Sequence, residues 1–459
     1  MKTVLLTLLL FLISCSSRKH SLVFNYGQIP FTISPKARPL DAISLKEKVA
    51  SVNGEIIPVQ QILDNAPSLN ELLAKERDIL MGLTYRMTSE KYKDKDVHIK
   101  FFSSEPSQGF SKLLKSLGIE ENPHIQVEFI PSSDQKKWAQ INDTFIKKSD
   151  VPLNHLQYWD TKNKQFYEVL RRLKGIIVRR LLFQMAQQEK VGVEDFIQKH
   201  IITAPINVTD SDVEELAQKQ GIVKEELTKP LKKRLKMILH EERKNHQIEK
   251  FIKKALKGPV VLYVKKPANK IILKENWAIS SHNPEALVTF TLFNNLTCTP
   301  CKKLNKLALQ LKSNKDIRVV FRPFFMPQDR SSRMLFEAAQ CVNDQNTNLF
   351  WKFVKAYTLP DKETSEEEIY KTVKEIHADF DQFKPCFLNR KFKDVVDYHL
   401  KYARYIGVTS LPSFFINGEI YFGPVDDQKI NDQIAYHIEE AQSRLNFFQR
   451  IWRALKKLF

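Results

Sequence analysis

The sequence predicts two folded parts, a mainly α-helical N-terminal part and an α/β C-terminal part. Between residues 164 and 255, apolar residues recur at three- and four-residue steps, which is the spacing of amphipathic helices. Beyond residue 284 the pattern changes to short β-branched and aromatic runs alternating with helical stretches. A length of 459 residues also exceeds what one compact core usually holds, so at least two domains are expected.

Composition excludes some classes of function. The chain has only twelve glycines and no Gly-rich phosphate loop, which argues against a nucleotide enzyme. The net charge is +19, but the basic residues are mixed with Glu and Asp along helical stretches, and no nucleic-acid-binding motif accompanies them. We therefore expect no nucleic-acid partner and interpret the charge as solvated helix faces; a weak attraction to anionic membranes is the alternative.

The N-terminus has the pattern of an export signal. Lys2 is followed by the apolar run Val4 to Ile13, which is too short to span a bilayer comfortably. The run ends in L-I-S-C at Cys15, which resembles the lipobox of bacterial lipoproteins. That resemblance implies a signal peptide at 1–14, lipidation of Cys15 and a periplasm-facing place in the bacterial cell envelope, with the outer membrane slightly favoured over the inner. An ordinary signal peptide or an uncleaved anchor is the alternative.

The region before residue 258 predicts a tether and a helical lobe. Residues 15–45 hold several prolines and little periodicity, so a tether is expected. A short β-type run then turns at Asn53-Gly54, helical periodicity runs from Val59 to Met87, and Thr209 with Asp212 forms an N-terminal capping box. Residues 90–150 carry no functional pattern.

This order of V-x-V-N-G-E, long helix, V-T-D-x-x-V and long helix resembles the N-terminal module of SurA-type periplasmic chaperones. The resemblance implies that residues 46–257 form a mainly helical lobe that holds unfolded polypeptide, with an insertion near 90–150. No prolyl isomerase domain is evident. Residues 258–284 are predicted to be a linker.

The cysteines predict redox chemistry in the C-terminal part. Besides Cys15 the chain has four cysteines, all after residue 297. Cys298-Thr299-Pro300-Cys301 stands between a strand-like run and a helical stretch, where the helix N-terminus would stabilise a thiolate on Cys298. Half of a zinc site and a purely structural disulfide are the alternatives. No second C-x-x-C exists, so we expect no metal, and no cofactor is implied.

A second motif lies about 110 residues downstream, in the run G-V-T-S-L-P-S-F-F-I-N-G at 407–418. Together with the C-x-x-C it resembles the DsbA-like branch of the thioredoxin superfamily, and the resemblance covers residues 285–440. It implies a thioredoxin-like fold with an inserted helical block and a cis bond between Leu411 and Pro412. In that family the backbone before the cis proline binds substrate, so Leu411, Pro412, Thr299 and Pro300 are the expected substrate-binding residues. The alternative is a trans proline at the start of an edge strand.

Two features depart from the strongly oxidising members of that family. The dipeptide between the cysteines is Thr-Pro rather than Pro-His, so no histidine charge stabilises the thiolate and a less oxidising disulfide is expected. Leu411 also replaces the Thr or Val often found before the cis proline, which puts the substrate preference in doubt.

The resemblance further implies a structural disulfide between Cys341 and Cys386, because some relatives carry a second disulfide in the helical insertion. A relay disulfide and two free buried thiols are the alternatives. At the C-terminus, residues 441–459 predict a basic amphipathic helix that lies either on an anionic membrane or on the protein itself.

The function predicted from these patterns is an envelope thiol–disulfide oxidoreductase with Cys298 and Cys301 as its catalytic pair. Its expected partners are unfolded or thiol-containing exported proteins, a membrane redox partner protein, and the membrane through the lipid anchor and the C-terminal helix. A chaperone-like polypeptide-binding lipoprotein with a secondary redox site is the second hypothesis. A structural membrane-linking protein is the third.

Overall fold

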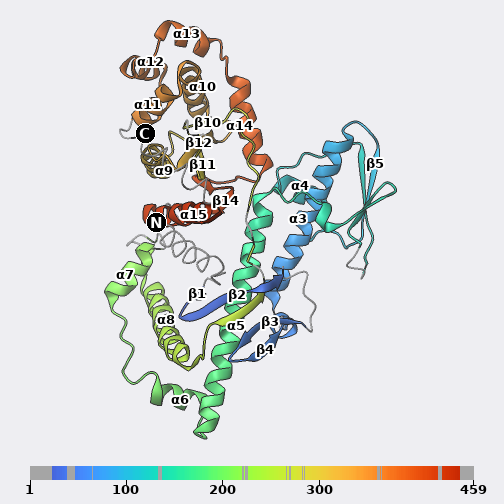
Figure 1. Ribbon diagram of the computed structural model, residues 1–459, viewed down its shortest axis with the longest axis vertical. Helices are drawn as coiled ribbons and strands as arrows, with labels where there is room; N and C mark the ends of the chain where they lie inside the picture. The colour runs from blue at the N-terminus through green and yellow to red at the C-terminus, as the bar shows by residue number, and fades with distance from the viewer. Residues whose placement is uncertain are drawn as a thin grey trace, which may run out of the picture. The chain divides into compact units, whose positions relative to one another are not determined.

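The computed structural model describes two compact units (Figure 1). Of the described residues, the first unit takes those between 23 and 73 and between 162 and 267, and the second takes those between 74 and 161 and between 270 and 444. The predicted signal peptide, Cys15 and the C-terminal helix beyond residue 444 lie outside the described residues. The described residues are 23–38, 47–64, 66–132, 137–219, 222, 226–264, 266–267, 270–281, 283, 285–358, 362, 364–421 and 426–444.

The first unit contains a five-stranded sheet in the order β1-β2-β9-β3-β4. The central strand β9 is parallel to β2 and antiparallel to β3. β3 and β4 form the predicted hairpin, in which Asn53 and Gly54 have the positive φ angles, 49° and 88°, that a tight two-residue turn requires. The strands are β1 (Val23–Tyr26), β2 (Ile29–Arg38), β3 (Lys48–Val52), β4 (Glu55–Pro58) and β9 (Val260–Val264).

Helices complete the first unit, as the sequence predicts. The predicted capping box is confirmed, since the Thr209 amide donates to Asp212 Oδ2 (2.7 Å) and the Asp212 amide donates to Thr209 Oγ1 (3.2 Å). The predicted helix from Val59 to Met87 is instead two helices, with α2 ending at Leu63 and α3 beginning at Pro67, because the residue before a proline is sterically disfavoured in the helical conformation. The helices are α2 (Val59–Leu63), the start of α3 (Pro67–Tyr92), most of α5 (Leu156–Gln188), α6 (Val193–His200), α7 (Asp210–Lys219) and α8 (Lys229–Ala255).

Two predicted boundaries differ from the structure. The sequence predicts a tether for residues 15–45, whereas residues 23–38 form β1 and β2, with Ile29 and Phe31 fully buried. Prolines obscure this pattern because they are rare in strands; one of them, Pro35, lies where the pairing of β2 with β9 is irregular. The predicted linker 258–284 contains β9, whose apolar run V-V-L-Y-V fits the middle of a sheet.

The C-terminal part of the second unit is the predicted α/β domain. Its sheet has the order β10-β12-β11-β13-β14, with β11 parallel to β12 and antiparallel to β13. Helices α10 to α14 are inserted between β12 and β13, so the predicted order of strand, C-x-x-C helix, strand, helical block, proline strand, strand and helix is confirmed. The elements are β10 (Ile279–Ser280), β11 (Val288–Asn294), α9 (Thr299–Leu311), β12 (Ile317–Pro323), α10 (Arg330–Gln345), α11 (Thr347–Thr358), α12 (Glu366–Glu375), α13 (Phe380–Leu388), α14 (Lys393–Tyr405), β13 (Ser413–Ile416), β14 (Glu419–Tyr421) and α15 (Asp427–Arg444).

Residues 74–161, which include the predicted insertion, form a four-stranded sheet with its own core, and we call this segment the insert. The sheet has the order β6-β5-β7-β8, and its core contains Phe101, Leu113 and Trp138. Its elements are the end of α3, β5 (Val97–Phe101), α4 (Phe110–Ser116), β6 (Ile125–Phe129), β7 (Ala139–Ile141), β8 (Thr144–Ile146), the short 3-10 helix η2 (Lys148–Asp150) and the start of α5. Among the residues that the structure describes, no helix combines the length and apolar character needed to cross a membrane.

Candidate active site

Cys298 and Cys301 form a disulfide at the N-terminus of α9. Cys298 is the N-cap residue and is partly exposed, whereas Cys301 lies in the first turn and is fully buried. The Cys301 amide points at Cys298 Sγ (3.2 Å), so an N–H group is already positioned beside the sulfur that would carry the negative charge. Together with the helix dipole, this contact favours a thiolate on Cys298 once the disulfide opens.

A buried network of amide and hydroxyl groups supports the loop that precedes Cys298. Asn295 donates to Ser332 Oγ (2.9 Å), and its Oδ1 accepts a hydrogen bond from the Thr297 amide (3.2 Å). Beneath the cysteines, Asn294 Nδ2 donates to the Cys301 carbonyl (3.3 Å) and to Asn305 Oδ1 (2.7 Å). These side chains connect β11, α9 and α10, and so position the C-x-x-C relative to the sheet.

The Leu411–Pro412 peptide bond is cis. Ser413, the first residue of β13, pairs with Phe293 near the end of β11, so the sheet register brings Pro412 beside the loop that leads to Cys298. Ser413 Oγ also donates to the Ser410 carbonyl (2.7 Å), which closes the turn around the proline. The two sequence motifs, more than 100 residues apart, therefore meet at one end of the sheet.

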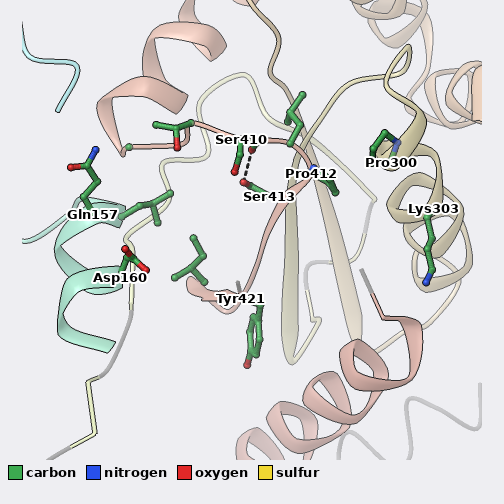
Figure 2. A pocket seen from close by; sticks show the side chains of 13 residues that line it. Gln157, Asp160, Pro300, Lys303, Ser410, Pro412, Ser413 and Tyr421 are labelled. Atoms are coloured by element: carbon green, nitrogen blue, oxygen red, sulfur yellow. Dashed lines mark hydrogen bonds between the residues drawn. The ribbon is translucent and has the colours of Figure 1, made fainter. Parts of the chain in front are cut away.

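A groove of about 550 Å³ runs along this end of the sheet (Figure 2). Pro300 and Lys303 of α9 lie on one side of it, and the cis-proline loop with Ile420 and Tyr421 of the β13–β14 hairpin forms another part of its lining. The Tyr421 hydroxyl contacts His437 Nε2 (2.9 Å), and burial raises the pKa of Tyr421 above its usual value, so this side chain is a neutral part of the lining. We call this hollow the client groove.

The remaining wall of the client groove comes from the start of α5, through Leu156, Gln157 and Asp160 (Figure 2). The wall is fixed to the C-terminal domain, because the Leu156 amide donates to the Ile406 carbonyl (2.8 Å). The fully buried His155 packs so tightly against Gly407 that a Cβ atom there would lie 2.7 Å from the imidazole.

The structure brings Cys298, Cys301, Thr299, Pro300, Leu411 and Pro412 together, and the sequence analysis singles out all six. It misses the α5 residues of the client groove, because they lie about 140 residues earlier in the chain and carry no motif. It also misses Asn294 and Asn295. They stand between a strand-like run and the C-x-x-C, and the sequence there predicts only a loop. Cys341 and Cys386 form a disulfide that joins α10 to α13.

Comparisons with known proteins find similarity in the C-terminal part of the chain. Residues 279–435 match the family model described as thioredoxin. Solved structures with similarity to this part include the thiol-disulfide exchange protein alpha-DsbA2 from Wolbachia pipientis, with 21% identity over 35% of this chain and 88% of that chain (TM-score 0.33). They also include oxidised BdbD from Bacillus subtilis, with 17% identity over 36% of this chain and 95% of that chain (TM-score 0.32). No curated protein sequence gives a significant match.

The match, the strand order and the disulfide define the class of the C-terminal part. It is a domain with the thioredoxin fold, and its C-x-x-C forms a disulfide at the N-terminus of the first helix. The inserted helical block and the cis-proline strand give it the DsbA-like arrangement that the sequence predicts.

Proposed function

We propose that this protein exchanges disulfides with exported proteins in the bacterial cell envelope, with Cys298 as the attacking or attacked sulfur and Cys301 as its partner. The observation that carries the proposal is the partly exposed Cys298 beside the fully buried Cys301, next to a cis proline and a groove of about 550 Å³. Only Cys298 is accessible to a second protein in this arrangement, which gives the two cysteines different roles.

In the oxidising direction, a client thiolate attacks Cys298 Sγ and breaks the Cys298–Cys301 bond. Cys301 leaves as a thiolate and takes up a proton, and client and protein are joined through a mixed disulfide. A second client thiolate then attacks the client sulfur and releases Cys298. The client loses two electrons and two protons and the protein gains them, so a membrane redox partner must reoxidise the pair. In the reducing direction the same steps run backwards.

The client groove suggests how a client is held during exchange. An extended segment beside the cis-proline loop can pair its backbone with that loop, as peptides do when they add a strand to a sheet. Leu156, Pro412 and Ile420 offer apolar contacts for its side chains, and Gln157 and Asp160 offer polar ones.

The first unit is proposed as a lobe that binds unfolded clients. It has a cavity of about 500 Å³ whose apolar lining comes from Ile176, Leu182, Phe183 and Val193, and Phe183 is 53% exposed. Exposed apolar surface beside a cavity is typical of binding surfaces for polypeptides. Lipidation of Cys15 would keep both units near the membrane across which the clients arrive.

The proposal is tested by trapping. A Cys301→Ser variant is incubated with an unfolded client whose single cysteine carries an activated mixed disulfide with a small aromatic thiol. The Cys298 thiolate should attack the client sulfur and release the aromatic thiolate, and the resulting mixed disulfide should accumulate because no internal thiol can resolve it. A matched Cys298→Ser variant should accumulate none, since Cys301 is buried. Equal trapping by both variants, or by neither, would refute the assignment of roles.

The direction of exchange is tested by titrating the Cys298–Cys301 pair with glutathione. A reduction potential near −120 mV would indicate disulfide donation, and one near −270 mV would indicate reduction or isomerisation, by comparison with DsbA and thioredoxin. Because Thr299 and Pro300 supply no charge, we expect a value between these limits, on the reducing side of DsbA. If Cys298→Ser leaves client protection unchanged in cells, the chaperone-like function is the correct one.

A further inference from the structure

The insert has the same strand connectivity as the thioredoxin-fold domain. In the C-terminal sheet, β11 is parallel to β12, antiparallel to β13, and β13 is antiparallel to β14; the helix α9 connects β11 to β12. In the insert, β5 is parallel to β6, antiparallel to β7, and β7 is antiparallel to β8; the helix α4 connects β5 to β6. A helix follows the last strand in both cases, α15 in one and α5 in the other.

The register of the two sheets defines which positions correspond. Phe101 pairs with Ala139, the first residue of β7, as Phe293 pairs with Ser413, the first residue of β13. Trp138 of the insert therefore occupies the position of Pro412. In the same way Phe145, which pairs with Gln140, corresponds to Tyr421, which pairs with Phe414.

The insert has no redox chemistry at the corresponding helix start. Gly109 is the N-cap residue of α4, as Cys298 is of α9. No cysteine occurs between Cys15 and Cys298 in the sequence, so the insert has neither an attacking nor a resolving sulfur. Trp138, at the position of Pro412, is buried in the insert core, so what the insert shares with the C-terminal domain is the sheet end and not the reactive helix start.

An aromatic surface lies at this end of the insert sheet. Phe145 is 59% exposed, and its ring stacks on that of the half-buried Phe102 at 6.0 Å between centroids. Lys137 Nζ lies 6.0 Å from the centre of the Phe102 ring. Exposed, stacked aromatic rings at the end of a sheet are typical of contact points for other polypeptides, because they bury large apolar area at a small entropic cost.

The insert is joined to the client groove through α5. The helix that follows β8 and η2 begins at Leu156 and forms a wall of that groove. Arg86 of α3 donates to the Tyr405 carbonyl (2.6 Å) and stacks on the Tyr405 ring at 4.1 Å, which also ties the insert to the helix before the cis-proline loop. The aromatic surface and the client groove therefore belong to one unit.

We infer that residues 74–161 are a second, cysteine-free domain of thioredoxin topology, and that its Phe102–Phe145 surface binds an extended, apolar segment of the client whose cysteine reacts at Cys298. The inference rests on the proposed function for the identity of the client. The surface raises the local concentration of the client near Cys298 without taking part in the exchange, since two contacts on one unit make the second binding event intramolecular.

The test measures noncovalent binding by the full chain carrying Cys298→Ser and Cys301→Ser, so that no mixed disulfide forms. The probe is fluorescently labelled ribonuclease A, reduced and carboxymethylated so that it stays unfolded, and the readout is fluorescence anisotropy. Adding Phe102→Ser and Phe145→Ser should raise the Kd about tenfold, as expected for the loss of two aromatic contacts. The control Leu388→Ser removes another side chain that is 55% exposed in the same unit and should change the Kd by less than about twofold.

Three outcomes would overturn the inference. The first is an unchanged Kd in the Phe102→Ser, Phe145→Ser variant and in Phe145→Lys, a single change at an exposed position that leaves the core intact. The second is an equal loss in Leu388→Ser. The third is that the parent chain sediments as a dimer and the two serine changes dissociate it, because the surface would then be a contact between two copies of the chain. A separate control keeps both cysteines: the rate of glutathione exchange by the Phe102→Ser, Phe145→Ser variant should equal that of the unsubstituted protein. If the unsubstituted protein itself does not exchange with glutathione, the proposed function is refuted and not this inference.

Discussion

The C-terminal sheet and the insert sheet share one connectivity, but their first helices begin differently. α9 starts from Cys298 in extended backbone (φ −84°, ψ 121°), with a side chain that accepts the Cys301 amide. α4 starts from Gly109 with φ +81°, a conformation that favours glycine, and has no side-chain cap. In the function proposed for the two sheets, both bind a client chain at this end, while reactivity depends on what occupies one helix N-cap.

The largest effect should come from removing Cys298. We expect Cys298→Ser to lower the rate of disulfide exchange with glutathione by at least about a thousandfold, because the only accessible sulfur of the pair is lost. Phe145→Ser in the insert should leave this rate unchanged. The measurement is the initial rate of mixed-disulfide formation; a comparable decrease in both variants would mean that the two sheets do not differ in chemical role.

The Cys341–Cys386 disulfide should stabilise the helical block of the C-terminal domain, which has no counterpart in the insert. It closes a loop with a sequence separation of 45 residues. Replacing both cysteines with alanine should lower the free energy of unfolding by about 2–5 kcal/mol. Urea denaturation measures this loss, and glutathione exchange at Cys298 at low denaturant should be retained. A loss of exchange with unchanged stability would indicate a relay disulfide instead.

Acid should weaken the attachment of the insert to the C-terminal domain. Burial, and next the charge of Arg86, lower the pKa of His155 from 6.5 to about 4. Burial and the charge of Arg322 lower that of His399 to about 3. Between pH 6.5 and these values the unfolded chain binds protons that the folded chain does not, so stability falls as the pH decreases, by about 1.4 kcal/mol per pH unit for each histidine.

Urea midpoints at pH 7 and pH 5 measure this dependence. His155→Gln removes the buried histidine of the insert, and His399→Gln removes that of the C-terminal domain. Each change should make the difference between the two urea midpoints smaller. If neither change alters the difference between the midpoints, the buried histidines do not cause the acid sensitivity.

The smallest effect concerns the N-cap of α4. Gly109→Ala should destabilise the insert by about 1–3 kcal/mol, because its φ of +81° and ψ of 150° are unfavourable for residues with a Cβ atom, although no neighbouring atom lies within 4 Å of that position. Gly54→Ala, which also has a positive φ and open space, provides the comparison in the first unit. Thermal unfolding of both variants measures the cost, and a stabilised Gly109→Ala would mean that α4 does not begin as described.

The sequence predicts the reactive half of the site well because its constraints are local. A C-x-x-C at a strand-to-helix junction and a proline before an apolar strand are each recognisable within about a dozen residues. The insert is not recognisable in this way. β7 and β8 contain three residues each, too few for a periodic pattern, and the position of Pro412 is taken by Trp138, which carries no signal of its own.

The α5 wall of the client groove is also invisible in the sequence, because it depends on tertiary packing. Leu156 and Gln157 belong to a long helix whose apolar periodicity indicates only that it is buried on one face. Their position beside the cis-proline loop follows from the contact of His155 with Gly407, which lies 252 residues later in the chain. Such contacts leave no local pattern.

The pairing of β2 with β9 has a consequence for how the chain is made. Phe31 lies beside Val260 in the sheet of the first unit, so this sheet cannot close until residue 260 has been synthesised. Every residue between them, including the whole insert, leaves the ribosome before the first unit is complete. The insert, which has its own core, can therefore fold before the sheet that precedes it in the chain, and the reactive cysteines are made only after that sheet can close.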